Sequence, residues 1–336
     1  MRTADFRYDL PEGAIAQEAI EPRDAARLLD TRRLEDREFR DLAALLRPGD
    51  LVVVNRTRVR SARLIGSKEA SGGRVEALLL RPCGDGSWEA LVRPARRIRV
   101  GSRLRFGPLV ATVSAGPVDG RVVLSPESGS VDEAVETIGE VALPPYFHGR
   151  LAHPERYQTV FGDRPGSAAA PTAALHLTPG LLHGLAAAGI ELGRLELDIG
   201  LDTFRPISAP DLASHQMHAE RFAIGEDLAA SVKAARERGG RVVAVGTTVV
   251  RALESAAAGD GLVSPVEADT ALFITPGYRF GVVDLLVTNF HIPGSTLVVL
   301  VAAFMGPAWR TAYSMALARG YRFLSFGDAM LAARAS

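Results

Sequence analysis

The sequence is poor in cysteine and in long apolar runs, and each shortage excludes a class of protein. Its 336 residues include a single cysteine, Cys83, which excludes an internal disulfide, a multi-cysteine zinc site and a cysteine-ligated iron–sulfur cluster. The longest apolar run covers residues 297–305, far below the ~20 residues that a membrane helix needs. No apolar run follows the first basic residue, so we expect no secretory signal. We expect a soluble, cytoplasmic protein with no membrane partner.

Lysine is also scarce, and the charges balance. Lys68 and Lys233 are the only lysines among 39 basic residues, and 39 acidic residues bring the net charge to zero. This balance hides a local excess, because residues 56–105 contain thirteen basic and four acidic side chains, a net charge of +9. A basic segment in a neutral protein indicates a nucleic-acid surface. An ordinary solvated surface fits the charge pattern equally well.

The predicted secondary-structure pattern changes along the chain. Between about residues 51 and 143, short alternating runs are separated by turn signals such as CGDGS and AGPVDG. This pattern is typical of a small antiparallel barrel or sandwich. Elsewhere, strands alternate with helices, which is typical of an α/β sheet. We therefore predict an α/β main domain, residues 1–56 plus 145–336, with an inserted small antiparallel β-barrel domain, residues 57–144.

Individual elements can be predicted in the α/β part. RVVAVG at residues 241–246 predicts a buried strand, followed by a helix over residues 249–258. Residues 226–238 predict another helix, and a third begins behind the Thr178-Pro179 pair and ends at Gly189. Three apolar runs predict further strands: ALFI at 271–274, DLLVTNF at 284–290 and YRFLSF at 321–326.

Polar residues lie where two of these strands are predicted to end. In an open α/β sheet, ligands bind at the carboxyl ends of the strands, and Asn289 and His291 follow the strand at 284–290. Thr247 and Thr248 follow the strand at 241–246 and open a helix, where hydroxyls and backbone amides can hold an anion or a nucleotide. Threonine is also an ordinary helix cap, so that interpretation stays open.

Three further segments contain candidate residues. In the H-x-x-H-x-E pattern, His218 and Glu220 would share one face of a strand and His215 the other, which favours a polar pair over a metal site. Small residues around His176 in APTAALH would permit close approach of a ligand, although tight packing around a buried histidine is the alternative. In DIGLDTF, two carboxylates flank the turn at Gly200 and can bind ribose hydroxyls or a cation, or can cap the turn.

Taken together and in order, these segments resemble the S-adenosylmethionine:tRNA ribosyltransferase-isomerase family of the queuosine pathway. The resemblance runs nearly from end to end. It is carried by DFRYDLPEGAIAQ (5–17), PRDAARLL (22–29), GDLVVVNRTRVRSARL (49–64), SGGRVEALLL (71–80), LPPYF (143–147), ERYQTVF (155–161), AAPTAALH (169–176), GLDTFRPI (200–207), HQMHAE (215–220), RVVAVGTTVVRALES (241–255), VVDLLVTNFHIPGSTL (282–297) and YRFLSFGDAM (321–330).

The resemblance implies an unusual reaction. The ribosyl part of S-adenosylmethionine moves to the aminomethyl group of preQ1, a 7-deazaguanine at the tRNA wobble position. Epoxyqueuosine forms, and adenine and methionine leave. S-adenosylmethionine is then a co-substrate, and no bound cofactor is implied. The sulfonium acidifies the neighbouring C5′ hydrogens, the amine must lose a proton and adenine must gain one, so positioned acid–base groups are required.

The resemblance also assigns roles to residues of this chain, which we expect to be a monomer. The implied catalytic residues are His176, His218, Glu220 and His291. The implied substrate-binding and S-adenosylmethionine-binding residues are Pro171, Thr172, Asp198, Gly200, Thr203, Thr247, Thr248, Arg251 and Asn289. The basic segment supplies the residues expected to bind tRNA, namely Arg58, Arg93, Arg96, Arg97 and Arg99. No metal is implied.

Several positions depart from the family's usual motifs. They are Ala174 for glycine, Leu177 for phenylalanine, Asp198 for histidine, Asp202 for glycine, and Arg56, Arg60 and Ser61 in NRTRVRSARL. These departures leave two alternatives open. The first is the same chemistry on a small amine acceptor other than tRNA, and the second is a non-catalytic RNA- or nucleotide-binding protein.

Overall fold

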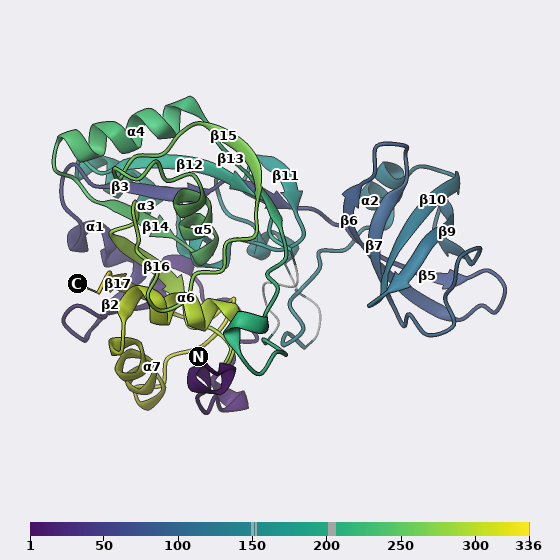
Figure 1. The fold of residues 1–336 in the computed structure, drawn as a ribbon, viewed down its shortest axis with the longest axis horizontal. Coiled ribbons are helices and arrows are strands. Elements are labelled where there is room, and N and C mark those ends of the chain that lie inside the picture. Colours follow the sequence, from purple (N-terminus) through teal and green to yellow (C-terminus); the bar gives the residue numbers. More distant parts are fainter. Residues whose placement is uncertain (149–150, 152, 201–205, 336) are drawn as a thin grey trace. The chain divides into compact units, whose positions relative to one another are not determined.

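The computed structural model describes residues 1–148, 151, 153–200 and 206–335 (Figure 1). They form two compact units. The α/β unit comprises Met1–Arg58, Pro145–Pro165 and Ala170–Ser336, and the barrel unit comprises Val59–Pro144 and Gly166–Ala169. Both the α/β sheet and the inserted antiparallel barrel are present, which confirms the predicted fold class.

A nine-stranded mixed sheet forms the centre of the described α/β unit. Its strand order is β15 (Val266–Thr270), β13 (Glu220–Ile224), β12 (Glu191–Leu197), β3 (Leu51–Asn55), β14 (Val242–Val245), β16 (Leu285–Asn289), β17 (Ala329–Ala333), β1 (Arg27–Asp30) and β2 (Glu35–Glu38). The four neighbours β12, β3, β14 and β16 run parallel. Their carboxyl ends therefore meet at one edge of the sheet.

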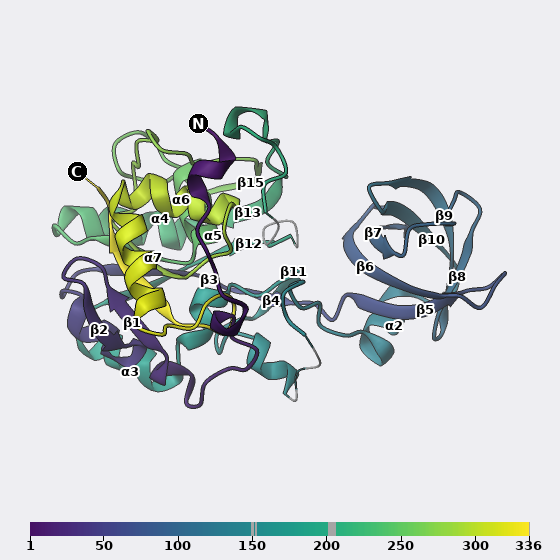
Figure 2. The same ribbon diagram turned by 90° about the horizontal axis from the view of Figure 1, so that it is seen from below.

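Burial on both faces explains why the central strands read as continuous apolar runs. Every residue of β3, β14 and β16 is buried. On one face, Val54 and Val245 pack in a core cluster with Leu181 of α3 (Pro179–Ala187) and Ala173 of the short helix η6 (Thr172–His176). The other face is covered by α4 (Glu226–Glu237) and α5 (Thr247–Ser255) (Figure 2).

Besides short 3-10 helices, the described part of the α/β unit contains three further α-helices. They are α1 (Leu42–Leu45), α6 (Thr296–Met305) and α7 (Ala308–Ala318). No single helix among the described residues is long and apolar enough to cross a membrane; α6 and α7 reach that length only together, with a bend of 116° between them.

The barrel unit is a closed antiparallel barrel. Going around it, the strands are β10 (Arg121–Ser128), β7 (Trp88–Arg93), β6 (Arg74–Pro82), β5 (Arg63–Lys68), β8 (Arg103–Phe106) and β9 (Leu109–Val118). Alternate residues such as Leu104 and Phe106 are buried inside it, as the period of two requires. The unit also contains the helix α2 (Val131–Ile138). The chain passes between the units through β4 (Thr57–Val59) and β11 (Arg164–Ser167), which pair as a small sheet.

Two of the predicted strands are wrong. Residues 321–326 form a loop that turns at Leu324, whose φ is 71°, and the strand of this region is β17 instead. The run is apolar because Tyr321 and Phe323 pack against Phe290 in an aromatic cluster. Residues 271–274 follow β15 rather than forming a strand, since the carbonyl of Leu272 accepts a hydrogen bond from Arg251.

Buried Asp50 ties β3 to β14, which predicts a large stability effect. Its carboxylate accepts from the Arg241 backbone and guanidinium and from the Arg47 amide, and its side chain is 1% exposed. We expect Asp50→Asn to lower the free energy of unfolding of the α/β unit by about 3 kcal/mol, because it leaves Arg241 without its counter-charge. In urea titrations, Glu35→Gln, which breaks an exposed pair with Arg37, should change it by less than about 1 kcal/mol. Equal effects of the two changes would contradict this ranking.

Candidate active site

A hollow lies in the α/β unit where the central parallel strands end. Its walls come from the segment before η6, from the ends of β12, β14 and β16, and from α6. They are formed by Ala170, Pro171, Thr172, Ala173, Ile199, Gly246, Thr247, Thr248, Thr288, Asn289, His291 and Leu297. The sheet topology thus brings together predicted site residues that lie more than a hundred positions apart in the sequence.

A second hollow shares four lining residues with this first hollow, and a third hollow shares Ser325 with the second. The second is lined by Tyr146, Thr172, Asn289, His291, Ile292, Leu297, Leu324 and Ser325, and the third by Ala19, Ile20, Arg23, Arg156, Leu175, His176, Ser325 and Phe326. Their free volumes are about 30 Å³ for the first and about 10 Å³ for each of the others, enough for a water molecule or two. A nucleoside would therefore bind only if the lining side chains move apart.

The amino end of α5 supplies hydrogen-bond donors to the first hollow. Gly246 precedes the helix with a φ of 101°, a conformation that favours glycine. The amides of Thr247 and Thr248 lie in the first helical turn and have no acceptor within the helix. Both side chains are buried, and neither hydroxyl has a hydrogen-bond partner in the part of the chain that the structure describes. These groups can bind oxygen or ring-nitrogen acceptors of a ligand.

Asn289 is held by a chain of hydrogen bonds. The Thr172 hydroxyl donates to its Oδ1 at 3.1 Å, and its Nδ2 lies 3.3 Å from His176 Nε2. Because Nε2 accepts from the amide, the proton of the imidazole is on Nδ1, which lies 3.3 Å from the Arg23 carbonyl. Burial lowers the pKa of His176 to about 4, so the ring is neutral at pH 7. His176 thus fixes the orientation of Asn289 at the hollow.

His291 is equally buried, but it lines the first two hollows directly. Its Nε2 lies 2.8 Å from the Thr288 hydroxyl, its amide donates to the Tyr313 hydroxyl, and its carbonyl accepts from the Tyr8 hydroxyl. Burial lowers the pKa of His291 to about 3. The imidazole is therefore a neutral hydrogen-bonding group at pH 7.

His218, Glu220 and Arg251 form a charged network beside α5. His218 Nε2 lies 3.2 Å from Glu220 Oε1, and the other carboxylate oxygen accepts from Arg251. Burial raises the pKa of Glu220, but the hydrogen bond from His218 and the charge of Arg251 outweigh burial and hold the pKa below its ordinary value. Glu220 is thus ionised, and its Oε1 also accepts from the Gly200 amide at 2.9 Å. Arg251 lies one turn after Thr247 on α5, but His218, Glu220 and Arg251 are not among the residues that line the three hollows.

The remaining predicted residues of this region are placed differently. The Asp198 amide donates to the Arg221 carbonyl between β12 and β13, and Asp198 is not among the residues that line the three hollows. Thr203 and Asp202 lie outside the described residues. The ring of His215 packs edge-on against Phe273. Among the described residues, no group of three or more His, Cys, Asp or Glu could hold a metal ion.

The sequence reasoning missed several polar residues of the second and third hollows. The hydroxyls of Tyr146 and Ser325 are hydrogen-bonded to each other in the wall of the second hollow. Arg23 and Arg156 line the third. The available signal was a hydroxyl inside each of two apolar segments, LPPYF and YRFLSF, but neither segment has a periodicity that marks its hydroxyl as a site group.

The predicted tRNA-binding arginines fall into two groups. Arg58 belongs to the α/β unit and pairs with Glu155 at 3.1 Å. The other four, Arg93, Arg96, Arg97 and Arg99, are exposed at the end of β7 and in the loop that leads to β8. None of these four has an acidic partner within the described ranges.

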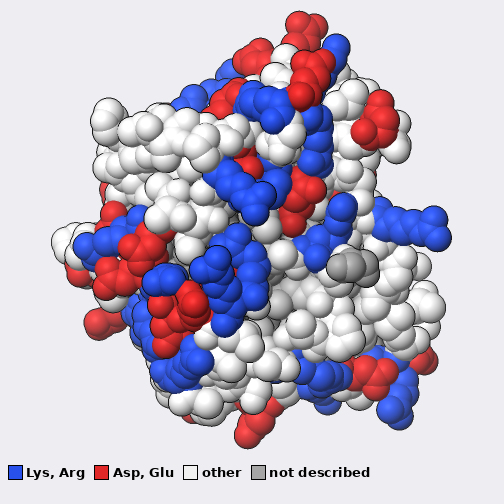
Figure 3. Space-filling model, turned by 90° about the vertical axis from the view of Figure 1, so that its left-hand side faces the viewer, with Lys and Arg blue, Asp and Glu red and all other residues white. Residues whose placement is uncertain are grey.

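Three of these loop arginines border a broad hollow in the barrel unit. Its volume is about 1260 Å³, and its charged lining consists of Lys68, Glu69, Arg74, Arg96, Arg97, Arg99 and Arg103. The hollow therefore carries a strong excess of positive charge. By contrast, basic and acidic side chains are intermixed on the face of the α/β unit that Figure 3 shows.

Comparison with known proteins identifies the family. The family model described as "Queuosine biosynthesis protein" matches residues 3–332. The chain is 52% identical to the S-adenosylmethionine:tRNA ribosyltransferase-isomerase of Symbiobacterium thermophilum and 50% identical to that of Moorella thermoacetica, each over 98% of this chain and 99% of the relative. The chain belongs to this family.

A solved structure supports the same assignment. The S-adenosylmethionine tRNA ribosyltransferase of Thermotoga maritima is 35% identical, with a TM-score of 0.55 over 97% of this chain and 99% of that protein. The family resemblance read from the sequence motifs is confirmed.

The two buried histidines predict a pH dependence of stability. Their folded pKa values lie below the ordinary ~6.5, so between pH 7 and pH 5 the unfolded chain takes up protons that the folded chain does not. We expect each of His176 and His291 to lower the free energy of unfolding by about 2 kcal/mol over this range. In His291→Gln, the free energy of unfolding, measured by urea titration, should decrease between pH 7 and pH 5 by about 2 kcal/mol less than in the wild type. An unchanged decrease would show that His291 titrates normally in the folded protein.

Proposed function

We propose that the three hollows of the α/β unit are where this protein uses S-adenosylmethionine as a ribosyl donor to preQ1-containing tRNA. The activity itself is that of the family: an S-adenosylmethionine:tRNA ribosyltransferase-isomerase of queuosine biosynthesis. The observation that carries the site proposal is the meeting of Thr247, Asn289 and His291 at the ends of parallel strands. Because the substrate is a tRNA, we expect the enzyme to act in the cytoplasm. We also expect it to be a monomer without a bound cofactor.

The first hollow suits the nucleoside part of S-adenosylmethionine. The amides and hydroxyls at the start of α5 can donate to ribose oxygens or adenine nitrogens, and the Asn289 amide is held ready by His176 and Thr172. Preorganised donors of this kind need little rearrangement when charge develops on the substrate. We assign substrate binding to Pro171, Thr172, Thr247, Thr248 and Asn289.

His218 is the best candidate for proton transfer. Its side chain is 22% exposed, whereas His176 and His291 are buried with strongly lowered pKa values. The ionised Glu220 beside it would stabilise the imidazolium and orient the ring, as a carboxylate does in other acid–base pairs. We infer that His218 exchanges protons with substrate, that Glu220 and Arg251 position it, and that His291 contacts substrate as a neutral hydrogen-bonding group.

Most departures from the family motifs have a structural explanation. Ala174 and Leu177 are fully buried in the core cluster, so they do not reshape the wall of a hollow. Arg56 pairs with Asp163, and Arg60 lies over the ring of Trp88. A changed acceptor therefore draws little support from these positions, and we favour tRNA over a small amine acceptor. Retained site groups argue against a non-catalytic protein.

The test of this function is product formation. Wild-type protein should release adenine and methionine from S-adenosylmethionine only when preQ1-containing tRNA is present. Release with free preQ1 but not with the tRNA would instead support a small-molecule acceptor. Binding of tRNA without any release would support a non-catalytic protein.

Replacing His218 should separate chemistry from binding. We expect His218→Gln to lower kcat at least about 100-fold, because a positioned proton-transfer group contributes that much, while the Kd for S-adenosylmethionine changes less than about threefold. The matched control is His183→Gln on the exposed face of α3, which should keep the wild-type kcat. A His218→Gln enzyme with wild-type kcat throughout its pH profile would remove His218 from this role.

The loop arginines should account for the salt dependence of tRNA binding. Removing one arginine that binds a phosphate should reduce the slope of log K against log salt by about one unit. We expect replacement of Arg93, Arg96, Arg97 and Arg99 by alanine to weaken tRNA binding and flatten this slope. Arg81→Ala is the control, because Arg81 is exposed in the same unit but pairs with Glu89. If the fourfold variant binds tRNA like the wild type, these arginines form only a solvated surface.

A further inference from the structure

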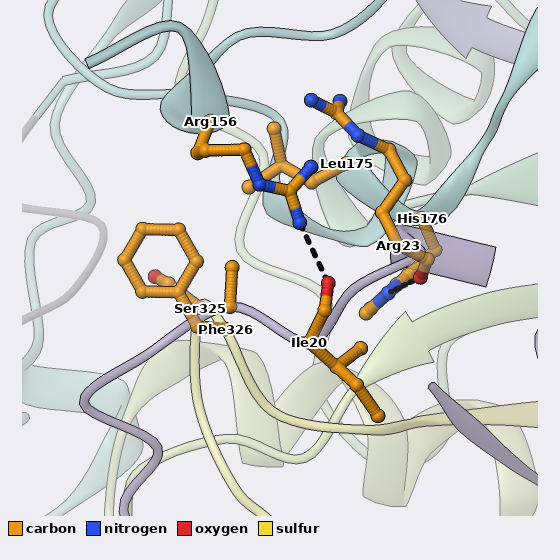
Figure 4. Close-up of a pocket in the computed structure, with 8 residues that line it drawn as sticks. Ile20, Arg23, Arg156, Leu175, His176, Ser325 and Phe326 are labelled. Atoms are coloured by element: carbon orange, nitrogen blue, oxygen red, sulfur yellow. Dashed lines mark hydrogen bonds between the residues drawn. The ribbon is translucent and has the colours of Figure 1, made fainter. Parts of the chain in front are cut away.

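The third hollow contains two arginines that the proposed chemistry does not use. Figure 4 shows Arg23 and Arg156 around this hollow together with Ile20, Leu175, Ser325 and Phe326. Ser325 also lines the second hollow, which in turn shares Asn289 and His291 with the first. The hollows therefore form a row from the amino end of α5 to the two guanidinium groups.

The two guanidinium groups keep donors to spare. Arg23 donates to the Gln158 carbonyl at 3.0 Å, and Arg156 donates to the Ile20 carbonyl at 2.7 Å. Arg156 also pairs with Glu21, whose side chain is 68% exposed. A guanidinium carries five N–H donors, so each arginine retains donors beyond these contacts. Arg23 has no acidic partner within salt-bridge distance among the residues that the structure describes.

The surroundings of these arginines favour an anion. Burial and the charge of Arg156 lower the pKa of Arg23, and Glu21 only partly offsets them. An oxyanion in the hollow would bring the counter-charge that Arg23 lacks. Arginine also offers carboxylates a fork of parallel donors, which suits this arrangement of two guanidinium groups.

We propose that Arg23 and Arg156 bind the carboxylate at the amino-acid end of S-adenosylmethionine. The inference rests on the proposed function, which puts the nucleoside in the first hollow. From there the amino-acid chain would pass along the second hollow to the third, where Ile20, Leu175 and Phe326 suit its methylene groups. An RNA phosphate fits this place less well, because it would bring two bulky riboses into a narrow hollow, whereas the carboxylate ends a thin alkyl chain.

Two matched ligands test this subsite. S-adenosylhomocysteine carries the carboxylate, and 5′-methylthioadenosine is the corresponding thioether without the amino-acid end. We expect Arg23→Met and Arg156→Met each to weaken S-adenosylhomocysteine about 10- to 100-fold, as the loss of a charge-assisted hydrogen bond does, and to change the Kd of 5′-methylthioadenosine less than twofold. Arg156→Lys should lie between these variants and the wild type. Arg33→Met, at an exposed arginine of the same unit, should bind both ligands normally.

Several outcomes would overturn the proposal. Equal weakening of both ligands would mean that the arginines only support the fold, and no weakening of either would mean that the carboxylate lies elsewhere. If the variants keep the wild-type ratio of the Kd values of the two ligands but show a flatter salt dependence of tRNA binding, the arginines bind an RNA phosphate instead. Each of these results leaves wild-type adenine release intact and so refutes the subsite alone. Wild-type protein that binds neither ligand would refute the proposed function and the subsite together.

Discussion

The parallel pairing of β12, β3, β14 and β16 is the constraint on which the candidate site depends. Three of them, β3, β14 and β16, are buried at every residue, so they lie in the middle of the sheet with helices on either side. Parallel neighbours end at the same edge, and the residues that follow them must lie together there. Thr247 and Asn289 are adjacent for this reason and not because of any attraction between them. The hydrogen-bonded pairing of the buried parallel strands thus determines which polar residues meet at the site.

Side-chain hydrogen bonds fix the orientation of the polar groups at this edge of the sheet. Asn289 would be free to rotate if it faced only solvent, but Thr172 and His176 bind both ends of its amide. His176 can do this because burial keeps it neutral, with one nitrogen accepting and the other donating. The same burial makes it a poor acid or base near pH 7. In this fold, burial fixes the orientation of His176 and His291 and makes them poor acids or bases near pH 7, whereas the side chain of His218 is partly exposed.

The sequence predicts features that depend on neighbouring residues better than features that depend on contacts between distant residues. Strand 241–246, the helices around it, and the polar residues at strand ends could be predicted because periodicity and caps are local. Arg23 and Arg156 could not be joined by such reasoning, since they lie in two separate short 3-10 helices, Arg23–Ala25 and Pro154–Tyr157, with no periodic pattern. Residues 321–326 were wrongly predicted as a strand. Their rings fill an aromatic cluster, and an apolar loop has the same composition as a strand. The burial of the His176 and His291 side chains, which lowers their pKa values, could not be predicted from the neighbouring sequence either.

The two units differ in how their charged side chains are neutralised. In the α/β unit, buried Asp50 pairs with Arg241 and buried Glu220 with Arg251, and buried Glu254 accepts hydrogen bonds from three backbone amides, because a buried charge without such partners costs several kcal/mol. The loop arginines of the barrel unit are exposed and need no internal partner, so they can meet an external polyanion at little cost. Arg23 follows neither pattern: it is partly buried, lies near a like charge and has no acidic partner within salt-bridge distance among the described residues. An oxyanion ligand would supply the counter-charge that Arg23 lacks, and S-adenosylmethionine carries a carboxylate at the end of a flexible chain.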